Sequence, residues 1–423
     1  MSYGRKGVGG KAPAPFRASP PFAVSVSSTS LYIHVPFCAG LCDYCDFFSV
    51  STSTNGENSA DAMDAFVGAV LEDAEDQLAC FEVENVPTVY IGGGTPSVLG
   101  AARIECLLAG LKGLLAHLRG QPAEVTIEAN PESVDKDFVL ACVAGGANRI
   151  SLGVQTFHEE ARGQIGRVGG LAQIEHGLSL AAQFFPGAFS ADLIAGLPFQ
   201  TSAVLLSDIA RLLEFRPAHV SLYSLTIDAE TVLEKRVSDK GRAALFLPTE
   251  DEADDLWLAG RDMLEQAGLE QYEVSNFALP GKTCAHNIRY WLMESWLGIG
   301  PAASGTVIGA NATGWRFTYP WDIASYLAAP RPRIRFAQTE KLRVADLMRE
   351  SLLMGFRYRG GPDAQTFKAR FGHDISSTIP ETIARWRQKG FFETELAPSK
   401  EGLLFVNSFL RDAFAEMDCA GGE

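Results

Sequence analysis

The sequence predicts an α/β protein built on an incomplete (β/α)6 barrel, followed by a mainly helical C-terminal part. Two observations support this fold class. From Leu31 onward, short apolar runs alternate with longer segments of helical period, and six such repeats occur before about residue 245. An open doubly wound sheet is the alternative arrangement. In both arrangements ligands bind at the carboxyl ends of the strands, so functional residues are expected there.

Each element of the predicted barrel has its own pattern. The apolar runs predict strands at 31–36, 86–91, 123–128, 149–153, 189–194 and 218–223. The segments between them predict helices at 61–80, 101–118, 134–144, 169–183 and 202–214. Unusual stretches follow the strands: three cysteines, then GGGTPS, EANPES, GVQTF and GLPFQT. This co-location predicts a single site at the strand ends.

The whole chain divides into four predicted segments. Residues 1–28 are a disordered extension rich in Gly, Pro and Ser, and 29–245 form the barrel. Residues 246–335, with a helix near 249–268, are an aromatic-rich connecting region, and 336–423 are a C-terminal module. This module is predicted to resemble a winged helix, with helices at 340–354, 363–371 and 378–389. A β hairpin over FFETELAPSKEGLLFV, with a Ser-Lys-Glu-Gly turn, would complete it.

Composition limits the function classes. The chain has 423 residues, 47% of them hydrophobic, and a formal net charge of −15. Such a charge disfavours attraction to nucleic acid or to an anionic membrane surface, so we interpret the C-terminal module as a packing unit. No apolar run approaches the roughly 20 residues needed to cross a bilayer, although peripheral membrane contact stays compatible with the sequence. Eight cysteines are too few for a disulfide framework. We expect a soluble cytoplasmic protein without a nucleic-acid partner.

Three of the cysteines are closely spaced. Cys38, Cys42 and Cys45 form C-x3-C-x2-C at the end of the first predicted strand. A structural zinc site needs four ligands, and a second pair is missing. A thioredoxin-like site would use only two of the three. Three thiolates suit a four-iron cluster that keeps one iron open. The other cysteines stand alone, and we interpret them as small buried hydrophobic residues: Cys80, Cys106, Cys142, Cys284 and Cys419.

The sequence around these cysteines resembles the radical S-adenosylmethionine (SAM) superfamily, and more narrowly the oxygen-independent coproporphyrinogen III oxidase family. The likeness rests on YIHVPF before the cysteines and on GGGTPS, EANPES, NRISLGVQTF, DLIAGLP and HVSLYSLT. It implies that the three cysteines hold a [4Fe-4S] cluster whose open iron chelates SAM, and that an electron from the cluster yields a 5′-deoxyadenosyl radical. It also implies these SAM contacts: Tyr32, Tyr44, Gly93, Gly94, Thr95, Glu128, Gln155, Arg167 and Asp192.

Two departures separate this chain from the oxidase. Phe47 stands where the oxidase has a further cysteine, and the longer N-terminal segment of the oxidase is replaced by a Gly- and Pro-rich stretch. Residues 286–291, HNIRYW, resemble the H-N-x-x-Y-W signature of a haem chaperone branch of this family. That resemblance implies haem binding, because histidine is the commonest protein ligand of haem iron and aromatic rings can pack against a porphyrin. The implied haem-binding residues are His286, Asn287, Tyr290 and Trp291.

The haem interpretation has alternatives at the level of residues and of function. Cys284 is a rival axial ligand, and His286 could instead be a packed, hydrogen-bonded core residue.

The favoured function is a haem chaperone that binds the cluster, SAM and haem and passes haem to an acceptor protein, with an electron donor for the cluster. The second is a coproporphyrinogen oxidase, an enzymatic activity that Phe47 and HNIRYW make less expected. The third is a radical SAM enzyme, such as a methyltransferase, with another substrate.

Overall fold

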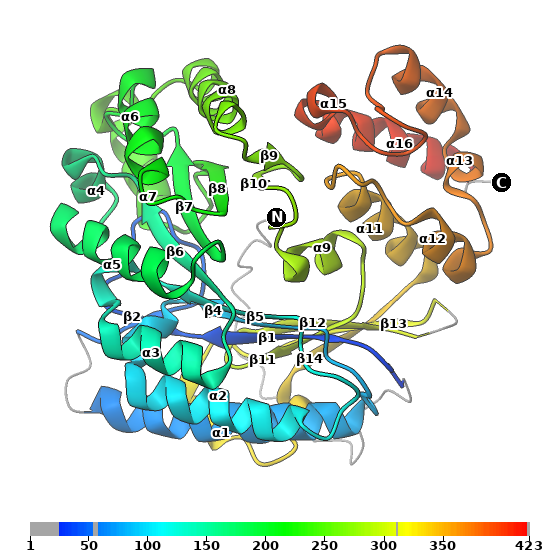
Figure 1. The fold of residues 1–423 in the computed structure, drawn as a ribbon. Helices are drawn as coiled ribbons and strands as arrows, with labels where there is room; N and C mark the ends of the chain where they lie inside the picture. The colour runs from blue at the N-terminus through cyan, green and yellow to red at the C-terminus, as the bar shows by residue number, and fades with distance from the viewer. Residues whose placement is uncertain (1–24, 54–57, 310–311, 421–423) are drawn as a thin grey trace.

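One large sheet of twelve strands organises the chain. The computed structural model describes residues 25–53, 58–309 and 312–420 (Figure 1). The strand order is β14-β13-β12-β11-β1-β4-β5-β6-β7-β8-β10-β9. From β1 to β8 neighbouring strands are parallel and follow chain order, without the reversal of a doubly wound sheet. The incomplete (β/α)6 barrel is therefore confirmed. Its strands are β1 (Ser30–Val35), β4 (Thr88–Gly93), β5 (Glu124–Ala129), β6 (Arg149–Gln155), β7 (Phe189–Ala195) and β8 (His219–Ser224).

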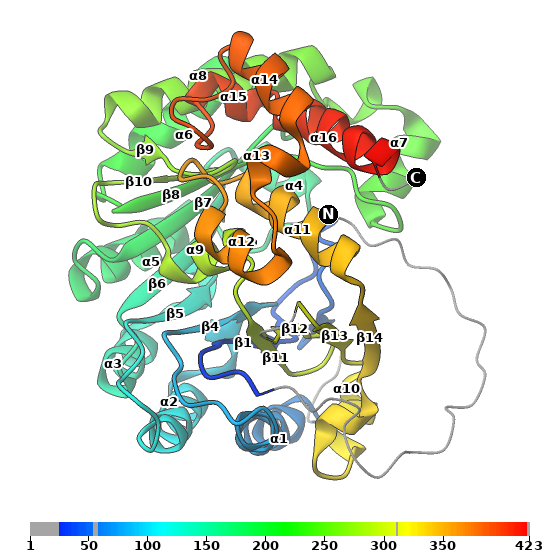
Figure 2. The same cartoon turned by 90° about the vertical axis from the view of Figure 1, so that its right-hand side faces the viewer.

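Helices cover the outer face of these strands (Figures 1 and 2). Several begin at a polar N-cap: the side chain of Asp135 accepts a hydrogen bond from Phe138 N, and that of Thr201 accepts one from Val204 N. The five predicted barrel helices are present as α1 (Asn58–Cys80), α2 (Ala101–Leu115), α3 (Lys136–Gly145), α5 (Leu171–Phe184) and α6 (Ser202–Leu213). The shorter pieces between strands are α4 (Glu159–Gln164), α7 (Val232–Lys240), η1 (Pro96–Leu99), η2 (Pro131–Ser133) and η3 (Ala243–Leu245).

The parallel strands have one apolar face and one polar face. In β1, Leu31 and Ile33 are fully buried in the core beneath the helices. The alternate residues Ser30, Tyr32 and His34 instead make side-chain hydrogen bonds inside the barrel. The same period of two recurs in β4 and β5, as it must in extended strands. The barrel interior is therefore a polar column that can bind ligands, where many barrels are filled by branched apolar side chains.

Residues 246–335, the predicted aromatic-rich connecting region, contain short strands and helices. After α8 (Glu250–Gln266) they add strands to the main sheet, and β11 pairs in parallel with β1, with Trp296 in register with Ser30. These strands have two to five residues, too few for a period-two pattern to be visible in the sequence. The elements are β9 (Glu270–Gln271), β10 (Asn276–Ala278), α9 (Ala285–Trp291), β11 (Trp296–Ile299), β12 (Ser304–Ile308), β13 (Gly314–Thr318), α10 (Ile323–Ala328) and η4 (Arg333–Phe336).

The C-terminal module is helical and has its own apolar core. The predicted hairpin is reduced to a single antiparallel bridge between Phe392 and Pro398. The predicted Ser-Lys-Glu-Gly turn is wrong, because Ser399 Oγ accepts a hydrogen bond from Gly402 N and so caps a helix. Strand β14 (Gln338–Leu342) still belongs to the main sheet. The helices are α11 (Val344–Gly355), α12 (Ala364–Phe371), α13 (Ile375–Thr378), α14 (Pro380–Gln388), α15 (Lys400–Leu404) and α16 (Val406–Ala420).

The predicted N-terminal extension is only partly within the described residues. Residues 1–24 lie outside them. Val26 is buried and its N–H donates to Phe81 O at 2.9 Å, while Ser28 forms a bridge with Asn85. Residues 25–28 therefore belong to the folded unit. Across the described ranges we find no helix with both the length and the apolar character to cross a membrane.

Candidate cofactor site and the HNIRYW segment

A cavity of about 380 Å³ opens at the carboxyl ends of the barrel strands. Its walls come from residues of β4, β5, β6, β7 and β8 and from the segments that follow β1, β4, β5, β6 and β8, as the sequence pattern predicts for this fold. The structure brings together these predicted site residues: Cys38, Cys42, Tyr44, Cys45, Gly93, Gly94, Thr95, Glu128, Gln155, Arg167 and Asp192. Tyr32 does not line the cavity; its hydroxyl lies 3.0 Å from His34 Nδ1, deeper in the barrel.

The cysteine loop is anchored to elements on the far side of the barrel. It leaves β2 (Phe37–Cys38), which pairs with β3 (Val50–Ser51). In its middle, Asp43 N donates to Ile165 O at 2.9 Å, and the Asp43 carboxylate pairs with Arg236 at 2.5 Å. A tight turn brings Cys45 N to 3.2 Å from Cys42 O. These contacts hold a short loop against the cavity so that one segment presents all three thiols.

The surroundings of the thiols suit metal-bound thiolates. Thr95 Oγ1 donates to Cys38 Sγ at 3.4 Å, and Arg167 donates to Cys42 Sγ at 3.6 Å. Burial raises the pKa of Cys38 and raises that of Cys45 to about 12, so an ionised sulfur there needs cationic partners such as iron. Among the described residues no three His, Cys, Asp or Glu side chains converge on a single-ion position. Thiolates around a four-iron cube each bind a different iron, so they need not converge.

Arg167 is a buried cation at the cavity wall. It donates to Asn130 Oδ1 at 2.7 Å and to Gly153 O, yet its Nε is buried without a hydrogen-bond partner among the described residues. Burial alone would lower the pKa of Arg167, but the nearby Glu132 and Cys42 raise it above the ordinary arginine value, so the group stays charged. A ligand carboxylate is the group that best satisfies such a cation.

Two carboxyl groups, Glu128 and Asp192, also line the cavity. Glu128 accepts the Tyr90 hydroxyl at 2.6 Å and Gly93 N at 3.0 Å. Burial, and to a smaller extent the charge of Asp192, raises the pKa of Glu128 to about 7. Burial likewise raises the pKa of Asp192, which accepts from Ser151, to about 6. A cationic ligand would favour the ionised form of both groups.

Local backbone geometry explains the glycines and marks a strained residue. Gly93 has φ of 104°, and a Cβ there would lie 2.3 Å from His34 Nδ1. A Cβ on Gly94 would lie 2.6 Å from Val35 O, so only glycine lets the two strand ends approach. Gln155 adopts φ of 69° next to an irregularity in the pairing of β6 with β7. Such outliers cluster at binding sites.

Further polar residues of the cavity were not predicted, although the stretches that contain most of them were quoted. Asn130 lies in EANPES and Ser151 in NRISLGVQTF, and the residues from Tyr223 onward lie in or just beyond HVSLYSLT. Except for Ser151, which lies within β6, their position at the end of a barrel strand or after it is the signal that could have identified them. Phe47 stands at the cavity wall, 62% exposed. The unpredicted polar residues are Asp46, Ser49, Asn130, Ser151, Tyr223, Ser224, Thr226 and Asp228.

The HNIRYW segment lies at the opposite end of the barrel. It forms α9, whose first backbone N–H groups, of Ala285 and His286, donate to the buried Glu124 carboxylate at 2.9 and 3.0 Å. Glu124 is the first residue of β5, and Ser30, which accepts from Arg289 at 2.6 Å, is the first residue of β1. Six-residue strands separate their two ends by roughly 20 Å. In Figure 1 α9 and β2 accordingly lie at opposite ends of the strands.

His286 is buried inside this end of the barrel, with 1% exposure. Its Nδ1 lies 2.8 Å from Thr88 Oγ1, and its Nε2 lies 3.1 Å from the Tyr290 hydroxyl. Because Thr88 donates to Ser30, Nδ1 carries the proton and Nε2 accepts. Burial, with a smaller effect of Arg289, lowers the pKa of His286 to about 3, so the ring is neutral. Both ring nitrogens are thus engaged in this conformation.

Cys284 is packed rather than exposed for ligation. Its Sγ lies 3.3 Å from Glu124 Oε1, and burial raises its pKa to about 12, so it is a neutral thiol. The interpretation of the isolated cysteines as buried is right for Cys142 and Cys284 and wrong for Cys106 and Cys419, which are exposed. Surface cysteines of this kind are indistinguishable from buried ones in a helix-period pattern.

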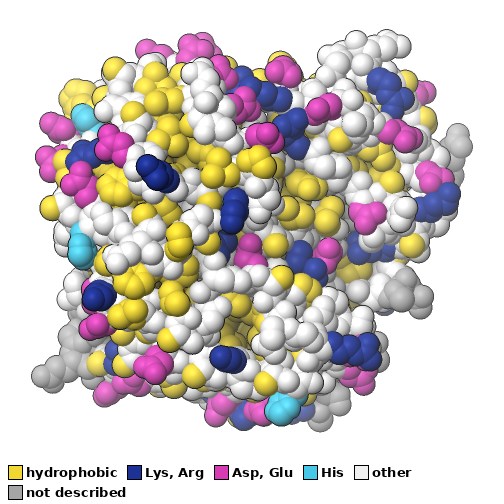
Figure 3. Space-filling model, viewed as in Figure 1, with side chains coloured by type: hydrophobic (Ala, Val, Ile, Leu, Met, Phe, Trp, Pro, Cys, Tyr) yellow, Lys and Arg dark blue, Asp and Glu magenta, His cyan; other side chains and the backbone are white. Residues whose placement is uncertain are grey.

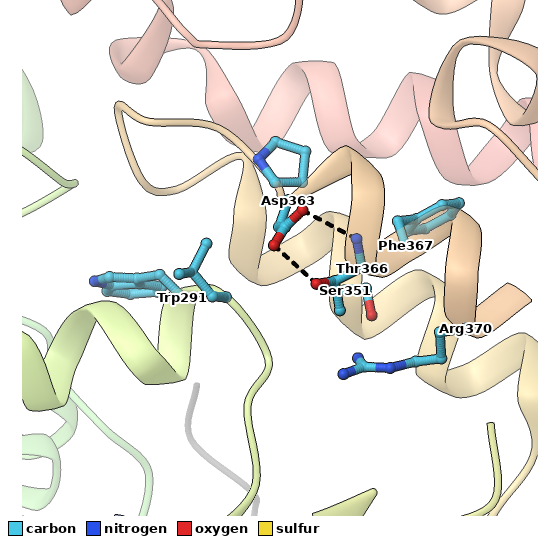
Figure 4. Close-up of a pocket in the computed structure, with 8 residues that line it drawn as sticks. Trp291, Ser351, Asp363, Thr366, Phe367 and Arg370 are labelled. Carbon is cyan, nitrogen blue, oxygen red and sulfur yellow. Dashed lines mark hydrogen bonds between the residues drawn. The ribbon is translucent and has the colours of Figure 1, made fainter. Parts of the chain in front are cut away.

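Trp291 faces the C-terminal module. Figure 4 shows it across a small cavity from Phe367 and Arg370 of α12. The cavity holds about 10 Å³, room for one water at most. Trp291 Nε1 lies at the end of the ring away from the other labelled residues in Figure 4, and it is buried without a hydrogen-bond partner in the described part of the chain. On the face seen in Figure 3, apolar side chains gather in the hollow between the barrel helices and the C-terminal helices. A porphyrin at Trp291 would require α12 and α9 to separate.

Comparison with known proteins agrees with this geometry. A model of the radical SAM superfamily matches residues 32–215. The "Heme chaperone HemW" of Lactococcus lactis subsp. lactis (strain IL1403) is 35% identical over 354 residues, which cover 84% of this chain and 88% of that protein. The protein of the same name from Escherichia coli (strain K12) is 37% identical over 284 residues, 67% and 71% of the two chains.

A solved structure shows the same fold. Coproporphyrinogen III oxidase (HemN) from Escherichia coli, described as a radical SAM enzyme, superposes with a TM-score of 0.75 at 21% identity, over 92% of this chain and 90% of that one. At this identity the likeness concerns the fold alone. The sequence relationship to the HemW proteins is closer, at 35% identity over 84% of this chain. The chain belongs to the HemW family of the radical SAM superfamily.

Proposed function

We propose that this protein is a haem chaperone that holds a [4Fe-4S] cluster and SAM at one end of its barrel and carries haem, its cargo, at the other. The names of its relatives support haem as the cargo. The observation that carries the proposal is the separation of the two sites, because HNIRYW begins at the amino ends of the strands whose carboxyl ends form the cavity. The proposal includes a cytoplasmic location, an external electron donor and a haem-accepting protein.

The cavity residues fit the cluster and SAM. The three thiols would ligate iron and leave one iron free, and Arg167, whose Nε has no hydrogen-bond partner among the described residues, would bind the SAM carboxylate. Glu128 and Asp192 would face its cationic or hydroxyl groups, and the glycines after β4 would allow close approach to the backbone. When bound, the cluster and SAM supply one-electron cleavage of the sulfonium carbon–sulfur bond. The cavity volume of about 380 Å³ lies in the range of single small-ligand sites.

The separation between the HNIRYW segment and the cavity disfavours the function of a coproporphyrinogen oxidase that binds its substrate at HNIRYW. Oxidative decarboxylation requires the porphyrin propionates to reach the cavity where SAM binds. A porphyrin held at His286 would have the Tyr90 side chain between it and the cavity, because the Tyr90 ring contacts His286 and the Tyr90 hydroxyl contacts the cavity-lining Glu128. Haem bound there would be separated by this side chain from the reductive chemistry in the cavity, which suits a carrier.

His286 has the surroundings of a histidine prepared to bind iron. In metal sites the non-ligating nitrogen donates to a fixed partner that sets the tautomer, and Nδ1 donates to Thr88 here. The other nitrogen, Nε2, is covered by the Tyr290 hydroxyl at 3.1 Å. We propose that haem iron binds Nε2 after Tyr290 moves aside, with Asn287 and Trp291 contacting the porphyrin.

This assignment predicts opposite effects of two substitutions on haem affinity. His286→Ala should abolish the haem Soret band of the protein. Tyr290→Phe keeps the aromatic ring but frees Nε2 from a hydrogen bond worth about 0.5–1.5 kcal/mol, so it should tighten haem binding about threefold to tenfold. Spectrophotometric haem titration measures both. Tyr319→Phe, which removes a buried hydroxyl bonded to Asp73 at 2.7 Å, is the matched control and should titrate like the wild type. An unchanged spectrum in His286→Ala would remove His286 as the ligand.

The raised pKa of Glu128 predicts a pH dependence of SAM binding. With its pKa raised to about 7, Glu128 is mostly ionised at pH 8 and mostly protonated at pH 6, and only the ionised form attracts a cationic ligand. SAM affinity should therefore fall about tenfold from pH 8 to pH 6. Equilibrium dialysis of the reconstituted protein measures it. Glu128→Gln should bind SAM more weakly and keep only a shallow fall of about twofold, which the titration of Asp192 contributes because its pKa is raised to about 6. A Gln variant that keeps the wild-type slope would show that another group titrates.

One anaerobic experiment distinguishes the chaperone from the oxidase. The protein with a reconstituted cluster is offered SAM, a reductant and either coproporphyrinogen III or haem. Stable haem binding without formation of protoporphyrinogen IX supports the chaperone. Conversion of coproporphyrinogen to protoporphyrinogen would overturn it.

A further inference from the structure

We infer that Tyr90 is a positioning residue that makes SAM affinity depend on the HNIRYW helix. Its ring lies against the His286 ring, with centroids 5.1 Å apart and planes tilted by 32°. Its hydroxyl donates to Glu128 Oε1 at 2.6 Å. One side chain thus touches both ends of the barrel. The inference rests on the proposed function in one respect, namely that the cavity binds SAM.

Packing on the side away from Tyr90 keeps the His286 ring in contact with Tyr90. Tyr290 stands perpendicular to it, with centroids 4.9 Å apart at 88°, and Tyr290 itself is backed by Trp296 at 4.9 Å and 88°. Thr88 holds the ring by Nδ1. His286 is therefore fixed between Tyr290 and Tyr90, and it supports the position of the Tyr90 ring. Removing the imidazole would leave Tyr90 free to shift toward α9.

On the cavity side Tyr90 determines where the Glu128 carboxylate lies. The two oxygens have separate donors, Oε1 the Tyr90 hydroxyl and Oε2 the Gly93 N–H. Space is tight as well: a Cβ on Gly92 would lie 2.6 Å from Glu128 Oε2 and 2.8 Å from Tyr90 Cε1. A shift of Tyr90 therefore removes one of two restraints on Glu128, and the freed carboxylate must be ordered again when SAM binds.

The same column continues from Tyr90 toward the cysteine loop. The Tyr32 ring lies 6.3 Å from that of Tyr90. The Tyr32 hydroxyl meets His34 Nδ1 at 3.0 Å, and His34 Nε2 meets Phe48 O, three residues after Cys45, at 2.8 Å. Tyr90 contacts both His286 and Tyr32 through its ring. A change at one ring therefore affects its neighbours by shifting their positions. By reciprocity, a ligand that binds at His286 and weakens SAM binding would itself bind more weakly, by the same factor, when SAM is present.

A double-mutant cycle on SAM affinity tests the inference without haem. The full chain with its cluster reconstituted is compared as wild type, His286→Ala, Tyr90→Phe and the double variant, by equilibrium dialysis of SAM. Each single substitution should weaken SAM binding about threefold to tenfold. The double variant should be no weaker than Tyr90→Phe, because without the hydroxyl the ring position no longer reaches Glu128.

Further variants make the result unambiguous. Thr88→Val is nearly isosteric and removes the hydrogen bond to His286 Nδ1. It should weaken SAM binding only when Tyr90 is intact. This variant replaces His286→Ala in the cycle if His286→Ala folds poorly. Tyr319→Phe removes a comparable buried hydroxyl bonded to a carboxylate elsewhere and should leave SAM affinity unchanged. Additive effects of His286→Ala and Tyr90→Phe, or no effect of His286→Ala, would overturn the inference. A wild-type protein that retains its cluster but binds no SAM would instead overturn the proposed function.

Discussion

Replacing Cys38, Cys42 or Cys45 singly by serine should abolish the iron–sulfur absorbance of the anaerobically reconstituted protein, and with it SAM binding. A four-iron cube that already has an open iron cannot lose a second protein ligand and stay bound at this site. Burial that raises the pKa of Cys45 to about 12 also means that the folded loop does not hold a thiolate on its own, so the loop geometry and the metal depend on each other.

The other cysteines are the controls for this experiment. Cys106→Ser changes an exposed thiol, and Cys142→Ser changes a buried one that does not line the cavity. Both should keep full iron content and the wild-type absorbance spectrum. A cluster that survives replacement of any one of the three motif cysteines would contradict three-thiolate ligation, and iron content per chain would show it directly.

Glu124→Ala should produce the largest loss of stability of any single change at the end of the barrel where α9 lies. Glu124 is 8% exposed and accepts hydrogen bonds from Ala285 N and His286 N. Alanine would leave two buried donors without a charged acceptor, at a cost of about 3–5 kcal/mol. If the chain unfolds cooperatively, its unfolding entropy converts this to a fall of about 5 °C in Tm. Differential scanning calorimetry measures it.

A surface glutamate gives the matched comparison. Glu175 pairs with Arg211 at 2.6 Å, but both side chains are partly exposed. Glu175→Ala should therefore cost at most about 1 kcal/mol and lower Tm by about 1 °C. Glu124→Gln, which keeps one acceptor oxygen, should fall between the two alanine variants. Equal losses for Glu124→Ala and Glu175→Ala would mean that α9 is not held by its buried carboxylate.

The barrel was predictable from sequence because its elements are long and its signals agree. Each parallel strand of six or seven residues is buried on its helix-facing side, and each is followed by a polar or glycine-rich stretch. The residues that the structure adds inside the barrel were not predictable in the same way. Thr88, Tyr90 and Glu124 are single polar residues within strands, and their importance comes from α9, which follows about 160 residues after the last of them.

The errors in the C-terminal half have a different physical origin. Ser and Gly occur both in turns and at helix starts, so Ser-Lys-Glu-Gly is ambiguous without its neighbours. The glycine there serves packing, since a Cβ on Gly402 would lie 2.2 Å from Phe391 O. Likewise, the pairing of β11 with β1 is a long-range contact that no local period reports. For His286 the motif marks the residue, but only the structure shows that both of its nitrogens are engaged.

The position of β1 has a consequence for biosynthesis. It is an interior strand, between β4 and β11, and Trp296 follows Val35 by about 260 residues. At the usual 5–20 residues per second, the ribosome needs about 13–50 s to supply that partner. For that interval the nascent chain exposes an apolar strand with one unpaired edge, which is a template for mispairing. The emerging polypeptide therefore depends on protection of β1 until its last neighbour is made.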